Sequence, residues 1–183
     1  MAGKERIVLK NPAGSGEDAI GWSADGVEEP ESYAQLYPPG SVQDLRFRFM
    51  RRLVVGARRW RGHVDQKLRR MDQSQARWET LLCASIHPGA TQGELARLVS
   101  VEDPTVARML TGLEKEGAIR RVIAEADRRQ RIVEVTPEGE KTLAAMQLII
   151  DMLRDAVLQD FDADELETGL RLLDKVLARL ELP

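Results

Sequence analysis

The sequence predicts a mainly α-helical protein, and three observations lead to this prediction. Aromatic residues make up only 4% of the chain while charged residues reach 31%, which suits helices with solvated charged faces better than an all-β core. Apolar residues recur at spacings of three and four over several long stretches. Two β-branched runs, at residues 119–124 and 131–135, indicate short strands. We therefore expect a set of helices and one short hairpin.

The length and the cysteine content narrow the class of protein. A chain of 183 residues can form one core, or one domain with an added dimerisation element. The single cysteine, Cys83, excludes an internal disulfide and fits a reducing cytoplasm. No stretch approaches the roughly 20 apolar residues of a membrane span, and the N-terminus lacks the apolar run of a secretion signal. We expect a cytoplasmic protein without a membrane partner.

The net charge of −3 conceals an uneven distribution along the chain. Residues 1–40 carry 3 basic and 7 acidic side chains, and residues 138–183 carry 5 basic and 11 acidic ones. Residues 41–137 carry 19 basic and 12 acidic side chains, so the middle of the chain is basic between acidic ends. A basic segment of this kind is either a solvated surface or a site for a polyanion such as nucleic acid.

The first part of the chain predicts an arm and then a long helix. Residues 1–40 have no sustained period and are rich in Gly, Pro, Ser and acids, which is typical of an extended arm. Ser41 and Asp44 then form a helix start, and one apolar stripe follows over residues 42–71 with arginines on the other faces. A second, shorter helix is predicted over residues 75–87.

Residues 91–117 predict a helix-turn-helix. Thr91 and Glu94 form a capping box for a first short helix, and Asp103 is predicted to cap a second one with Pro104 at its first position. This second helix should end at a left-handed Gly117. Its apolar face packs inward, and the other face is small near its start and basic beyond, as a DNA-reading helix or an ordinary surface helix would be. The outer face consists of Pro104, Thr105, Arg108, Thr111, Gly112 and Lys115.

The hairpin that follows makes the pattern a winged helix, whose hairpin tip can enter the minor groove of DNA beside the reading helix. Asp127 and Arg129 lie two residues apart in an extended segment, so we predict that they pair and leave Arg128 for phosphate or groove. The flanking Arg120, Arg121 and Arg131 are predicted to contact backbone phosphates. A long helix capped by Thr136 and a last one capped by Asp162 or Asp164 complete the chain.

The segment "TQGELARLVSVEDPTVARMLTGLEKEGAIRR", followed by "DRR" and "VTPEG", resembles the MarR (multiple antibiotic resistance regulator) family of winged helix-turn-helix transcriptional regulators. Val135 stands where the family has leucine. The resemblance implies a homodimer that reads a pseudo-palindromic double-stranded DNA operator, with Thr105, Arg108 and Thr111 on the recognition helix and Asp127 and Arg129 in the wing. It divides the chain into an arm outside the family pattern (1–40), a first dimerisation helix (41–74), the DNA-binding domain (75–137) and the C-terminal dimerisation helices (138–183).

The resemblance also implies a repressor that is released by a small, often aromatic and anionic, ligand. Residues Arg58, Arg59, Trp60 and His63 lie near the family's ligand cleft, where arginine can pair with the carboxylate of an aromatic acid or an acyl conjugate while Trp60 stacks on a ring. The alternative is that Trp60 is interface core and the arginines are solvated.

Other functions find less support in the sequence. Cys83 has no partner cysteine for redox sensing, and Cys83, His63 and His87 do not have the spacing of metal ligands. No pair of nucleophile and base can be identified, so we predict neither an enzyme nor a cofactor. A non-specific architectural DNA-binding protein and a winged-helix protein–protein interaction module are the alternatives to a sequence-specific regulator.

Overall fold

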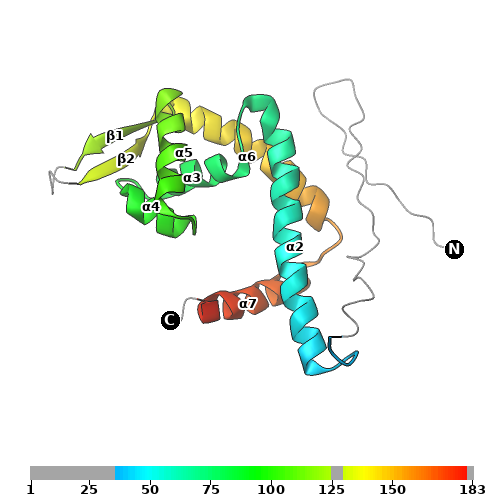
Figure 1. Ribbon diagram of the computed structural model, residues 1–183. Helices are drawn as coiled ribbons and strands as arrows, with labels where there is room; N and C mark the ends of the chain where they lie inside the picture. The colour runs from blue at the N-terminus through cyan, green and yellow to red at the C-terminus, as the bar shows by residue number, and fades with distance from the viewer. Residues whose placement is uncertain (1–35, 125–129, 181–183) are drawn as a thin grey trace, which may run out of the picture. The chain divides into compact units, whose positions relative to one another are not determined.

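The computed structural model describes residues 36–124 and 130–180 of the chain. The described residues belong to two compact units, residues 36–150 and residues 151–180, and helix α6 continues from the first into the second. Figure 1 shows the elements and labels all of them except η1. They are, in chain order, α2 (Val42–Leu68), η1 (Arg69–Met71), α3 (Gln75–Ile86), α4 (Gln92–Leu98), α5 (Asp103–Lys115), β1 (Ile119–Ile123), β2 (Arg131–Val135), α6 (Pro137–Leu158) and α7 (Ala163–Leu180).

Side-chain caps explain where the first helices begin. The Ser41 hydroxyl accepts a hydrogen bond from the Asp44 N–H (3.2 Å), and the Asp44 carboxylate accepts one from the Gly40 N–H (2.8 Å). At α4 the predicted capping box is present: the Thr91 hydroxyl accepts from the Glu94 N–H, and the Thr91 N–H donates to the Glu94 carboxylate (2.7 Å). The hydrogen bonds from Thr91 lower the pKa of Glu94, so this cap weakens only as the pH falls through that lowered value.

The predicted cap of α5 is wrong by one residue. Glu102, not Asp103, is the N-cap, and its carbonyl accepts from the N–H groups of Thr105 (2.9 Å) and Val106 (3.2 Å) without a side-chain cap. Asp103 is therefore the first helical residue and Pro104 the second. Neither position needs an amide donor inside the helix, so the proline is tolerated there as well as at the predicted place. The predicted end is confirmed, because Gly117 has a φ of 73°.

The core of the first unit lies where α3, α4 and α5 pack together and meet the hairpin. β1 and β2 pair antiparallel from Ile119 opposite Val135 to Ile123 opposite Arg131. The Val133 N–H also donates to the Ala90 carbonyl (2.9 Å), which ties the hairpin to the residues before α4. The fully buried side chains here are Val64, Leu68, Thr80, Leu81, Leu95, Val106, Leu110, Leu113, Val133, Met146 and Ile150.

α4, α5 and the hairpin form a winged helix-turn-helix, and the predicted mainly helical fold with a two-stranded wing is confirmed. In the second unit, α7 begins with a capping box in which Asp162 accepts from the Glu165 N–H (2.8 Å) and Glu165 accepts from the Asp162 N–H (3.1 Å). This decides between the two predicted caps in favour of Asp162. None of the helices in the described ranges is long and apolar enough to cross a membrane.

Candidate DNA-binding surface

Helix α5 has two sharply different faces. Val106, Leu110 and Leu113 are fully buried against the core and hold the helix in place. The opposite face holds the predicted recognition residues: Pro104, Arg108, Thr111 and Lys115 are exposed, and Thr105 and Gly112 are partly exposed. The structure therefore brings all of these side chains to one surface that is available to a partner.

The hairpin supplies further cations beside this helix. Arg120 and Glu134 are direct cross-strand partners, and their side chains form an ion pair with 2.6 Å between Nε and Oε2. The Arg120 side chain is still 70% exposed, so its other N–H groups can reach a phosphate. Arg131, at the outer end of β2, is also exposed. The predicted Asp127–Arg129 pair and the free Arg128 lie outside the described residues.

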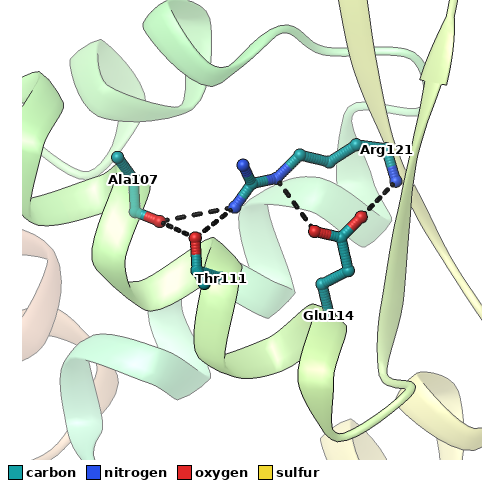
Figure 2. Close-up of polar contacts among 4 residues, drawn as sticks. All are labelled: Ala107, Thr111, Glu114 and Arg121. Atoms are coloured by element: carbon teal, nitrogen blue, oxygen red, sulfur yellow. Dashed lines mark hydrogen bonds and ion pairs between the residues drawn. The ribbon is translucent and has the colours of Figure 1, made fainter.

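Arg121, which is predicted to contact a phosphate, has partners within the protein. Its side chain lies along α5 and is only 21% exposed (Figure 2). Its Nη2 donates to the Thr111 hydroxyl (2.8 Å), and its Nε lies 3.6 Å from a Glu114 carboxylate oxygen. The reason is strand alternation, because Arg121 shares the inward face of β1 with the buried Ile119. Its observed partners are protein groups.

A second cluster near the end of α5 was not predicted from the sequence. Arg77 of α3 pairs with Glu116 and lies over Gly112, where an added Cβ would come within 3.2 Å of its guanidinium. Gln73 donates to the same Glu116 carboxylate (3.2 Å). Opposite charges 39 residues apart leave no local pattern in the sequence. The cluster fixes the C-terminal end of α5 on α3.

The structure between β2 and α6 shows why the "VTPEG" segment contains Thr136 and Gly139. The Thr136 hydroxyl accepts from the Gly139 N–H (3.1 Å), which caps α6, and donates to the Gly117 carbonyl (2.6 Å), which ties α6 to the end of α5. Gly139 is buried, and a Cβ on it would lie 2.0 Å from the Ala118 carbonyl oxygen. Glycine is required here because the helix passes directly against the backbone that leads into the wing.

The residues predicted to bind a ligand lie on the second half of α2. Arg58 and Arg59 are exposed, and Trp60 and His63 are partly buried. An open cavity of about 600 Å³ is lined by residues of 86–98, including His87, and another of about 550 Å³ by residues of 45–52. Neither of these cavities includes the four predicted residues, so their ligand role stays a prediction.

The environment of Cys83 does not favour redox sensing. Burial raises the pKa of its thiol, and the negative charge of Glu79 raises it further. A raised pKa leaves less of the reactive thiolate at neutral pH. Within the described residues there is also no group of three or more His, Cys, Asp or Glu side chains that could hold a metal ion.

The family pattern that matches the sequence and the solved structures that resemble the fold agree on the class of protein. The sequence pattern of the MarR family matches residues 74–130. The structure of transcriptional regulator PA3341 is 38% identical with a TM-score of 0.67, and the match covers 73% of this chain and 98% of that one. A MarR family transcriptional regulator from Silicibacter pomeroyi DSS is 28% identical, with a TM-score of 0.70 and coverage of 79% and 97%. The S. aureus MepR–DNA complex is 25% identical, with a TM-score of 0.63 and coverage of 77% and 97%. The chain belongs to the MarR family of winged helix-turn-helix, DNA-binding transcriptional regulators.

Proposed function

We propose that this protein is a homodimeric repressor that reads a pseudo-palindromic operator and is released from it by a small aromatic anion. The observation that carries the DNA-reading part is the outer face of α5, where Arg108, Thr111 and Lys115 are exposed beside a basic hairpin. Small residues at the start of the face allow close approach to the base edges, and the cations beyond them suit phosphates. The relative MepR has been solved in complex with DNA, which supports DNA binding by this chain.

The proposal of a homodimer rests on α7. Leu166, Leu170, Leu173, Leu177 and Leu180 are spaced by three and four residues, and all are exposed in the single chain. An apolar stripe of this length on one helix is rarely left in water by a soluble protein. A second copy of the chain is the occupant we propose, because a two-fold interface can bury the same stripe on both subunits and so match a palindromic site.

The main test is to select bound fragments from the genome of origin and to titrate the selected operator and random DNA in parallel. A sequence-specific regulator should prefer its operator by ~10³ or more. A ratio near one would identify an architectural DNA-binding protein. Absence of binding to either DNA would favour a protein–protein interaction module.

Arg108→Ala is expected to weaken operator binding by roughly 1–3 kcal/mol and to relax base preference at one position per half-site, because an arginine at the centre of the face can bind guanine with two hydrogen bonds. The measurement is a titration with operators carrying each of the four bases at every position. Lys141→Ala removes an exposed cation on α6 and should leave the preference unchanged. Equal loss of affinity by Arg108→Ala on operator and random DNA would make Arg108 a phosphate contact instead.

The release of DNA by a ligand is proposed to depend on Trp60 and Arg59. A ligand shifts the equilibrium only by its different affinity for the DNA-binding and released forms, and a rotation of a few degrees spoils the fit to half-sites ~34–36 Å apart. Trp60→Ala and Arg59→Ala should therefore reduce release by aromatic acids while leaving ligand-free operator binding nearly unchanged. Arg61→Ala, an exposed neighbour on α2, is the control. Full release from both variants would place the ligand elsewhere.

A further inference from the structure

The hydroxyl of Thr111 stands on the exposed face of α5, and its hydrogen bonds within the protein are defined. It donates its proton to the carbonyl oxygen of Ala107, one turn earlier in the helix, at 2.8 Å. It accepts a hydrogen bond from Nη2 of Arg121 at 2.8 Å. A threonine hydroxyl has one proton and two acceptor positions. One acceptor position is therefore all that it has left for a partner in front of the helix.

On the side that faces Arg121, the Thr111 hydroxyl can accept a hydrogen bond but cannot donate one. A guanidinium has donors and no acceptor, so the Thr111 oxygen can only accept on that side. The same Nη2 also lies 3.4 Å from the Ala107 carbonyl oxygen, which places cation, hydroxyl and carbonyl in one small cluster (Figure 2). The hydroxyl proton has its acceptor at Ala107 and cannot turn toward Arg121.

Glu114 holds Arg121 in position from the other side. Its carboxylate accepts from the Arg121 backbone N–H at 3.2 Å and lies 3.6 Å from the Arg121 Nε. Strand β1 and helix α5 are thus joined through one arginine, and this side chain is mostly covered. Because Glu114 lies beside Arg121 and offsets its charge, Arg121 is less available to attract phosphate than the more exposed Arg120.

We propose that Thr111 presents only a hydrogen-bond acceptor to DNA and therefore selects a base with an amino group, adenine or cytosine, on the strand that it faces. In the major groove, adenine offers its N6 amino group and cytosine its N4 amino group, whereas guanine and thymine offer acceptors in the equivalent places. An acceptor facing an acceptor leaves both groups unsatisfied, which is costly at an interface. Arg121 and Glu114 are positioning residues for this choice. The proposal rests on the proposed function, since it requires that α5 reads the major groove.

The experiment measures the affinity of the dimer for its selected operator with all four bases at each position. Wild type should have one position per half-site where adenine or cytosine is preferred by about 3- to 10-fold over guanine and thymine, as expected for a single net hydrogen bond. The Thr111→Val variant should lose this base preference and keep the base preferences at the other operator positions. Thr105→Val makes the same change elsewhere on the helix and should leave the Thr111 position unaffected. Where adenine is preferred, replacement by purine, which lacks the amino group, should weaken wild type but not Thr111→Val.

The positioning role is tested by a charge-balanced double variant, Arg121→Ala with Glu114→Ala. With Arg121 gone, the Thr111 oxygen loses the hydrogen bond that holds its side chain in one rotamer, so the preference at the Thr111 position should fall toward one while the preference set by Arg108 is retained. In the free protein, NMR three-bond couplings should show a single Thr111 side-chain rotamer, and the double variant should show averaging between rotamers. Averaged rotamers in wild type, or no difference in the double variant, would overturn the fixed hydroxyl without reference to DNA.

Two results would overturn the base selection alone. One is a preference for guanine or thymine at the position that Thr111→Val alters; a loss on replacing thymine by uracil there would point to a methyl contact instead. The other is a preference that survives in Thr111→Val. A protein that selects no operator at all would refute the proposed function and this inference together, so the two failures are distinguishable.

Discussion

Replacing Gly139 by alanine is expected to lower the free energy of unfolding by about 3 kcal/mol or more, the upper end of what overpacking costs. The new Cβ would lie 2.0 Å from the Ala118 carbonyl oxygen and 2.8 Å from a methyl of Val135. The first of these neighbours is backbone, which cannot rotate away as a side chain can. Chemical denaturation of wild type and variant, followed by far-UV circular dichroism, measures the change.

A matched control is Gly93→Ala in α4. Gly93 lies on the same winged helix-turn-helix, is exposed, and a Cβ there has no neighbour within 4 Å. This substitution should leave stability unchanged or raise it by up to roughly 1 kcal/mol, because alanine favours a helix over glycine. If Gly139→Ala were as stable as Gly93→Ala, the close passage of α6 against Ala118 would be wrong.

The second large effect is expected from Leu170→Asp with Leu177→Asp in α7. If the leucine stripe is the two-fold interface, each substitution occurs twice and places an unpaired carboxylate in an apolar contact, which costs several kcal/mol. The variant should be a monomer by analytical ultracentrifugation. Operator affinity should fall by about 100-fold or more, because one DNA-binding domain then binds one half-site without the second domain of a dimer.

The control for this variant is Lys175→Asp. Lys175 is exposed on the face of α7 opposite the leucine stripe, so it adds a negative charge to the same helix without entering the stripe. It should remain a dimer with near wild-type operator affinity. A double leucine variant that also stays dimeric would assign dimerisation to another surface and leave the stripe unexplained.

Local sequence rules predicted the main helices and the hairpin of this protein, although α5 begins one residue earlier than predicted. Ser41, Thr91 and Thr136 each cap the helix predicted from them, and Gly117 ends α5 as expected. These predictions are confirmed because a cap or a left-handed glycine depends on atoms within about four residues. The buried stripe of α5 follows from the helical period in the same way. The outer face of the recognition helix therefore follows from the order of its residues alone.

What the sequence could not determine are contacts between residues on different helices and strands. The sequence did not show that Arg121 contacts Thr111 and Glu114 on another element, or that Arg77 meets Glu116 across 39 residues. In the sequence, nothing distinguishes Gly139 from other helical glycines. Only the structure shows that the Ala118 backbone lies directly against it. A long, flexible cation has several partners in reach, and only the packing of α5 against β1 and α3 selects one. The sequence thus determined which face of α5 points outward, and the tertiary structure decided which polar atoms of that face form hydrogen bonds within the protein.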